Sequence, residues 1–90
     1  ELQNNIAAMT LFPNPSQGKT TLGYVLKKNN TVSVEVLNIT GQRVALFLDQ
    51  ENKQAGKQST NLPADLAPGV YFIRLTAGEA VEVQKLVVTN

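Results

Sequence analysis

The stretch TVSVEVLNITGQRVALFL, residues 31–48, contains two apolar runs separated by a short polar segment. From Val32 to Val36, valines alternate with polar residues, which is the period of a strand with one buried face. The second run, Val44 to Leu48, follows a polar segment that contains Gly41, and glycine can adopt the positive φ of a tight reversal. The stretch therefore predicts an antiparallel hairpin.

The same pattern recurs further along the chain. The run from Val70 to Leu75 has the composition and alternation of a strand, with Tyr71, Ile73 and Leu75 on one side. The run from Val81 to Val88 follows it across Ala77-Gly78-Glu79. These residues predict a second hairpin.

Three further runs have strand composition: Ile6–Leu11, Thr20–Leu26 and Gln58–Leu62. About seven short strands with turn signals between them, and no window of helical period, predict an all-β fold, a small antiparallel immunoglobulin-like β-sandwich. The polar segment 49–57 is expected to be an exposed connection between strands, and each of the six glycines is expected at a turn.

Two prolines, Pro13 and Pro15, flank Asn14 directly after the first predicted strand. Each proline fixes φ at about −65° and removes a backbone donor, so the incoming strand cannot continue through them. The segment predicts a rigid corner that locks the first strand onto the sandwich.

Length and charge exclude several classes of protein. Ninety residues accommodate one domain, and a net charge of +1, from eight basic and seven acidic residues, indicates no surface for nucleic acid or an anionic membrane. No apolar run approaches the roughly 18 residues that span a bilayer, and the first residues lack the pattern of a signal peptide. The chain is expected to be part of a larger protein whose export signal lies elsewhere.

The absence of histidine and cysteine excludes histidine-assisted serine catalysis, thiol catalysis and the usual zinc sites. We therefore predict no enzymatic activity and no cofactor. Two carboxylates and an asparagine in segment 49–57 offer oxygen ligands for calcium. Because their spacing is not that of an EF-hand loop, a solvated loop is the favoured interpretation.

The aromatic residues bear on carbohydrate binding, and they are Phe12, Tyr24, Phe47, Tyr71 and Phe72. A sugar-binding module displays coplanar rings on one face. Tyr71 and Phe72 are adjacent in a strand, so they point to opposite faces and at least one belongs to the core. Core packing is favoured over a sugar platform.

Three motifs occur in the order typical of one protein family. They are Pro13-Asn14-Pro15 with Gly18 after Phe12; VEVLNITGQRV, with Asn38, Ile39 and Gly41; and LAPGVYFIRL followed by QKLVV, with Gly69, Tyr71, Ile73, Lys85, Val87 and Val88. Together they resemble the C-terminal sorting domain of the type IX (Por) secretion system, type A, and they cover nearly the whole chain. Gln84 departs from the family pattern, in which a second lysine is common.

The resemblance implies that residues 11–90 are a C-terminal sorting domain, preceded by a linker and first strand region at residues 1–10. Such a domain directs a cargo protein on its N-terminal side through the outer-membrane type IX translocon. The expected route leads through the periplasm to the cell surface or the medium. A sortase-like peptidase then removes the domain and can link the cargo to lipopolysaccharide. The cargo and the cleavage position, in or before residues 1–9, stay open.

The resemblance places most of the recognition in the final hairpin, and the predicted partner-recognition residues are Lys85, Leu86, Val87 and Val88. The exposed edge of the last strand offers main-chain pairing to a receptor sheet or to a second copy of the chain. An alternative role for Lys85 is to protect this edge against aggregation. The residues with predicted structural roles are Pro13, Asn14, Pro15, Gly18, Asn38, Gly41, Gly69 and Tyr71.

Two other functions are compatible with the fold. An accessory carbohydrate-binding or adhesive module of a secreted enzyme would present paired aromatics on one face. A structural spacer would occur in tandem copies. The chain contains no internal repeat, which favours the sorting domain over the spacer.

Overall fold

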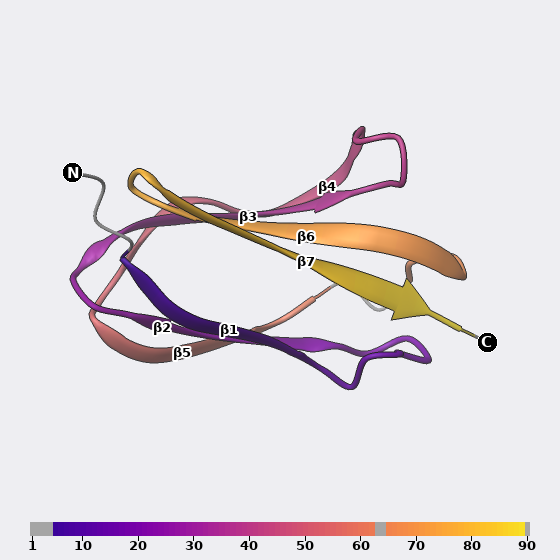
Figure 1. Ribbon diagram of the computed structural model, residues 1–90, viewed down its shortest axis with the longest axis horizontal. Helices are drawn as coiled ribbons and strands as arrows, with labels where there is room; N and C mark the ends of the chain where they lie inside the picture. Colours follow the sequence, from indigo (N-terminus) through magenta and orange to yellow (C-terminus); the bar gives the residue numbers. More distant parts are fainter. Residues whose placement is uncertain (1–4, 63–64, 90) are drawn as a thin grey trace.

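The computed structural model describes residues 5–62 and 65–89, which form seven strands in two layers (Figure 1). The strands are β1 (Ile6–Phe12), β2 (Thr21–Leu26), β3 (Asn30–Leu37), β4 (Arg43–Lys53), β5 (Gly56–Asn61), β6 (Gly69–Ala77) and β7 (Ala80–Val88). A three-stranded sheet has the order β1-β2-β5, and a four-stranded sheet has the order β4-β3-β6-β7. All the strand pairs are antiparallel, and the predicted all-β immunoglobulin-like sandwich is confirmed.

Both predicted hairpins are present, as the β3–β4 and β6–β7 pairs. In the second hairpin Ala77 pairs with Ala80, and Gly78, with φ of 62°, is the first residue of the two-residue turn between them. No helix in the described part of the chain is long and apolar enough to cross a membrane.

The core lies between the sheets and is formed by inward side chains of every strand except β5, together with Leu62 directly after β5. The valines of β3 that alternate with polar residues are fully buried, as are Ile73 and Leu75 in β6 and Leu22 in β2. Burial of an aliphatic side chain of this size contributes about 1.5–3 kcal/mol to stability. The alternation that predicted the strands is therefore also what fixes their inner faces.

The expected loop at residues 49–57 is wrong for most of its length. β4 continues through polar residues to Lys53, which pairs with Asn30, and β5 begins at Gly56. Main-chain pairing does not require apolar side chains, so this extension carries no hydrophobic signal. A bulge interrupts β4 at Gln50, which has a φ of 50° and whose N–H donates to the Ser33 hydroxyl at 3.0 Å.

Gly23 is the glycine that does not lie at a turn. It is in the middle of β2, paired with Thr10 of β1 and Ser59 of β5, so the expectation for this position is wrong. A Cβ atom at this position would lie 3.1 Å from the Thr10 hydroxyl oxygen. The close approach of Thr10 explains why the smallest residue fits here.

Core packing of the aromatics is correct for three residues and wrong for Phe12, while Phe72 faces outward, opposite to Tyr71, as their adjacent positions in one strand predict. Tyr24 is buried, and Phe47 and Tyr71 pack against the core. Phe12 is 54% exposed because the alternation of β1 directs Met9 and Leu11 inward, and Phe12 therefore outward.

Candidate functional site

β7 carries the predicted recognition residues, and the structure divides them between its two faces. β7 is an edge strand of the four-stranded sheet, paired with β6. Leu86 and Val88 point into the core and are almost fully buried, whereas Lys85 is exposed and Val87 half-buried on the other face. In the folded domain, the side chains of Lys85 and Val87 are therefore the ones within reach of a partner.

The segment from Pro13 to Ser16, which we call the Pro13–Ser16 corner, lies against β7. β1 ends at Phe12, and the peptide bonds preceding Pro13 and Pro15 are both cis. Between the prolines, the Asn14 side-chain amide donates to the Lys85 carbonyl oxygen at 2.8 Å, and its oxygen accepts from the Val87 N–H at 3.1 Å. One side chain thus satisfies a donor and an acceptor of an edge strand.

Ser16 extends this contact through its main chain. Its N–H donates to the Val87 carbonyl at 2.8 Å, its carbonyl accepts from the Thr89 N–H at 2.7 Å, and it forms a parallel bridge with Val88. The buried Ser16 hydroxyl also accepts from the Gly18 N–H at 3.0 Å, which fixes the turn that follows. Figure 1 shows the end of β1 and the end of β7 at the same end of the molecule.

The edge of β7 is consequently not free along its whole length, contrary to the expectation of an exposed last strand. The outward main-chain groups of Val87 and Thr89, and the carbonyl of Lys85, are bonded to the corner. Further along β7, the Gln84 side chain donates to the Met9 carbonyl of β1 at 2.6 Å, which joins the two sheets. Gln84 stands where the family pattern often has a lysine, so this departure has a structural role here.

The Asn38 motif organises the turn between β3 and β4. The Asn38 side-chain oxygen accepts from the N–H groups of Thr40 and Gln42 at 3.1 and 2.9 Å, and its main-chain N–H donates to the Gln42 carbonyl at 2.8 Å. Gly41 has a φ of 88°, a conformation that a side chain disfavours. The motif thus builds a turn that satisfies its own polar groups.

Tyr71 performs a similar task at the start of β6. Its hydroxyl donates to the Ala67 carbonyl at 2.6 Å, four residues upstream, while its ring packs against the core. This arrangement resembles the tyrosine corner of immunoglobulin-like domains. Gly69, with φ of 156°, begins the strand beside it.

A cluster of charges lies on the outer face of the four-stranded sheet. Glu35 of β3 accepts hydrogen bonds from Arg74 at 2.8 Å and from Arg43 at 3.3 Å. The bond from Arg74 lowers the pKa of Glu35 below its ordinary value, and this effect outweighs desolvation, which acts in the opposite direction. Alternation places Glu35 on this face, but only the strand register brings Arg74 opposite to it, and the sequence does not reveal that register.

Tyr24 is the second residue with a shifted pKa, and burial is the main cause. The Tyr24 ring lies in the core, and burial raises the pKa of its hydroxyl, with a smaller contribution from the charge of Glu51. Tyr24 is therefore neutral at physiological pH and contributes packing rather than charge.

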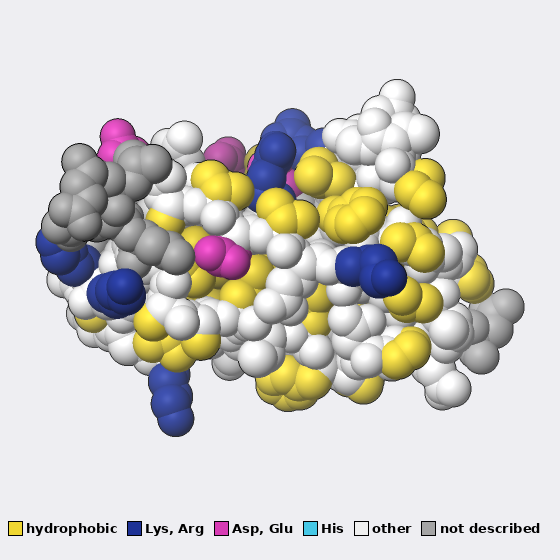
Figure 2. All heavy atoms as spheres, in the orientation of Figure 1, with side chains coloured by type: hydrophobic (Ala, Val, Ile, Leu, Met, Phe, Trp, Pro, Cys, Tyr) yellow, Lys and Arg dark blue, Asp and Glu magenta, His cyan; other side chains and the backbone are white. Residues whose placement is uncertain are grey.

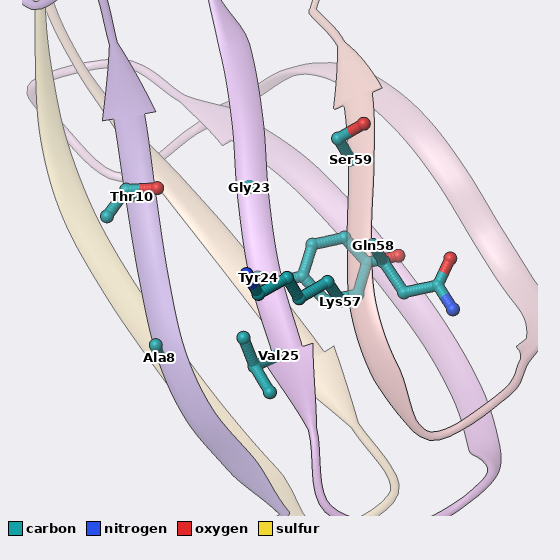
Figure 3. Close-up of a pocket in the computed structure, with 8 residues that line it drawn as sticks. All are labelled: Ala8, Thr10, Gly23, Tyr24, Val25, Lys57, Gln58 and Ser59. Atoms are coloured by element: carbon teal, nitrogen blue, oxygen red, sulfur yellow. The ribbon is translucent and has the colours of Figure 1, made fainter.

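The outer face of the three-stranded sheet contains a shallow hollow of about 430 Å³ above Gly23. Figure 3 shows Gly23 on the central strand between Thr10 and Ser59 of the neighbouring strands, with Lys57 and Val25 nearby. Small and polar side chains line most of the hollow. Tyr24 is the one aromatic residue among those that line it, so the hollow does not offer a pair of rings on which a sugar could stack.

The outward-facing aromatic side chains of the two sheets, Phe12 and the half-buried Phe72, do not form a common surface. Phe12 lies on the outer face of the three-stranded sheet, and Phe72 on the outer face of the four-stranded sheet. Residues 5–62 and 65–89 also contain no group of three or more His, Cys, Asp or Glu placed to hold a metal ion. The placement of Phe12 and Phe72 on opposite outer faces disfavours the carbohydrate-binding alternative.

Comparison with protein families matches residues 10–89 to a model described as a secretion system C-terminal sorting domain. A search of curated proteins finds no match. The matched region extends from the second half of β1 to the residue after β7, and it includes the corner, the Asn38 turn and β7.

Proposed function

The chain belongs to the family of type IX (Por) secretion system C-terminal sorting domains, and we propose that it directs an N-terminally attached cargo protein through the outer-membrane translocon of that system. Membership makes it a sorting signal of a non-catalytic family, and implies export to the cell surface or the extracellular space. In our proposal, the cargo passes through the periplasm, a sortase-like peptidase removes the domain, and the cargo is then released or attached to lipopolysaccharide.

The contact between the corner and β7 carries the proposal. Two family motifs, separated by about 70 residues, hydrogen-bond to each other through Asn14 and the main chain of Lys85 and Val87. The Asn38 turn bonds mainly within itself, whereas the Asn14 contact fixes the strand that displays Lys85. We infer that the translocon recognises the folded unit made by both motifs rather than a linear tail.

The four predicted recognition residues have two different roles in the proposal. The exposed ammonium of Lys85 and the half-buried Val87 are available for contact, while Leu86 and Val88 anchor the strand in the core. Main-chain pairing with a receptor strand is restricted to the part of β7 before Gln84, because the corner is bonded to the rest.

Secretion of a reporter tests the proposal. A fluorescent protein fused upstream of Glu1 is expressed in a bacterium with a working type IX system and in the same strain without its translocon. We expect translocon-dependent appearance of the reporter on the surface or in the medium. A reporter retained in the periplasm, on a domain that is folded by circular dichroism, would contradict the sorting function.

Point substitution then tests the recognition strand. Lys85→Ala should reduce secretion severalfold, whereas Lys57→Ala, at an exposed strand position in the opposite sheet, should not. If Lys85 only protects the edge against aggregation, Lys85→Ala will lower the soluble yield and leave the secreted fraction of the soluble protein unchanged. Deletion of the last residues is a poorer test, because it removes Leu86 and Val88 from the core.

A further inference from the structure

The outer face of the four-stranded sheet consists of cross-strand rows that the register defines. Leu46, Glu35, Arg74 and Val83 lie in one row across β4, β3, β6 and β7. The next row contains Arg43, Leu37, Phe72 and Lys85. Each row contains two apolar and two charged side chains, so apolar and charged residues are mixed across all four strands of this face.

This face is unusually apolar for the solvent side of a sandwich. Among the described residues, the exposed large hydrophobic side chains in strands, apart from Phe12, belong to β4 and β7, and they are Val44, Leu46, Val81 and Val83. Leu46 is 41% and Val83 49% exposed, at opposite ends of the same row. Figure 2 shows hydrophobic side chains along the line of β7 with a basic side chain among them.

The outer face of the three-stranded sheet differs in kind. Its central row contains Thr10, Gly23 and Ser59, and the neighbouring row contains Ala8, Val25 and Lys57. Small and polar side chains predominate, as expected of a face that remains in water. Apart from Phe12, which is exposed on this face, the exposed large hydrophobic residues in strands therefore lie in the other sheet, and such a concentration of apolar surface is the usual mark of an interaction surface.

The charges of the apolar face are unbalanced. Its two central rows contain three cationic side chains, on Arg43, Arg74 and Lys85, and one carboxylate, on Glu35. Both arginines are paired with Glu35, and in the described part of the chain Lys85 makes no ion pair. The face thus carries an excess of two positive charges within an apolar surround.

We propose that the outer face of the four-stranded sheet, from Leu46 in β4 to Lys85 in β7, docks onto an apolar protein surface that carries acidic side chains opposite Lys85. The proposal rests on the sorting function and names the chemistry of the partner. Electrostatic complementarity supports the proposal. An acidic side chain of the partner could pair with the Lys85 ammonium, and the two arginines share a single carboxylate, so positive charge remains for a second acidic group. The apolar side chains within these rows would supply the contact area.

An anionic membrane is the less suitable partner for this face. Side chains that enter a bilayer interface project from an amphipathic helix or a loop tip, whereas these lie on a flat sheet with the Glu35 carboxylate in its middle row.

The test uses a position outside the recognition strand. In the reporter assay, Leu46→Thr should reduce the initial secretion rate by about fivefold or more, as expected for an apolar contact within an interface. Val25→Thr, the matched substitution on the outer face of the other sheet, should leave the rate unchanged. Both variants are first shown to fold by thermal unfolding. If Leu46→Thr lowers stability, Val81→Thr supplies a second variant of the same face.

A charge series at Lys85 tests the acidic character of the partner. We expect Lys85→Arg to be secreted nearly normally, Lys85→Gln to be impaired and Lys85→Glu to be impaired most. Equal rates for Lys85→Gln and Lys85→Glu would overturn the acidic partner.

The outcomes separate the two proposals. If the wild-type fusion is not secreted in a translocon-dependent way, the sorting function itself is wrong. If Lys85→Ala impairs secretion while Leu46→Thr behaves like Val25→Thr, the sorting function stands and the extended docking face is wrong. Binding of the purified domain to vesicles of anionic phospholipid that Leu46→Thr abolishes would show a lipid partner and would also overturn this inference.

Discussion

The two halves of the outer edge of β7 differ although they belong to one strand. From Lys85 to Thr89, the edge is bonded to the Pro13–Ser16 corner. From Ala80 to Val83, the strand has the same alternation and the same partner, β6, but the corner does not extend this far. The chain covers one half of an edge strand with a loop from the other sheet.

The difference shows how a sandwich without disulfides protects an edge selectively. Exposed edges invite pairing with other chains, and proteins commonly cover them with loops or charges. Here a short segment with two prolines, whose own strand has ended, supplies the missing partners. The covered half also contains Lys85, so the corner holds in place the residue that we expect a partner to contact.

The largest effect on stability should come from the buried side of the covered half. Leu86 is 1% exposed, so Leu86→Ala should lower the free energy of unfolding by about 3 kcal/mol. Val83→Ala, at a 49% exposed position in the open half, should cost about 0.5 kcal/mol or less. Urea unfolding of the two variants measures both values, and equal losses would contradict the burial pattern.

Removal of the Asn14 side chain should abolish the difference in edge protection between the two halves of β7, residues 80–83 and residues 85–89. Asn14→Ala eliminates the acceptor of the Val87 N–H and the donor to the Lys85 carbonyl, so we expect a loss of about 1–2 kcal/mol. The Val83 N–H points to the same side as that of Val87, by the alternation of an antiparallel edge.

Hydrogen exchange gives the site-specific measurement. In the wild type, the Val87 amide should exchange more slowly than the Val83 amide, and in Asn14→Ala the Val87 rate should rise about tenfold toward that of Val83. Thr21→Ala is a control on the other sheet, since the Thr21 hydroxyl donates to the Asn61 side-chain oxygen across the strand pair. A Val87 amide that exchanges rapidly in the wild type would show that the corner is open in solution.

Acid should weaken the ion pairs of Glu35, in the row that ends in residues 80–83 of β7, and should leave the hydrogen bonds of the corner unchanged. The corner uses amide and hydroxyl groups, whereas Glu35 lies in the row that ends at Val83. Since the pKa of Glu35 is lowered in the folded state, its contribution is fully present above the ordinary value of about 4.5 and is lost as the pH falls through the lowered pKa.

We expect this acid-dependent contribution to be about 1 kcal/mol at most, because both arginines are partly exposed. Glu35→Gln should flatten the fall in unfolding free energy between about pH 5 and pH 3, and Asn14→Ala should leave the shape of that curve unchanged. If the unfolding free energy of the wild type and of Glu35→Gln depends on pH in the same way, Glu35 does not cause the loss of stability in acid.

Periodicity predicted the strands that have a buried face, as in the valine alternation of β3 and in the run that became β6. It failed where pairing alone defines the strand, as in the polar extension of β4 to Lys53. It also failed at Gly23, where the need for a small residue arises from Thr10 on the neighbouring strand.

The candidate site was less accessible to sequence reasoning than the fold. Alternation within β7 could separate Lys85 and Val87 from Leu86 and Val88, but nothing local indicates that Asn14 contacts them. The bulges in the β3–β4 pair shift its register, so the row that joins Leu46 to Glu35 could not be derived from the spacing of the two runs. Long-range contacts of this kind depend on the packing of both sheets.

The hydrogen bonds of Asn14 join residues that are 71 and 73 positions apart in the chain. During synthesis from the N-terminus, residue 14 leaves the ribosome long before its partners exist, and the corner cannot close until residues 85–89 have been made. A chain that stops before Lys85 therefore has a corner whose amide side chain lacks both of its bonds. The state of this one asparagine distinguishes a chain that already contains residues 85–87 from one that does not.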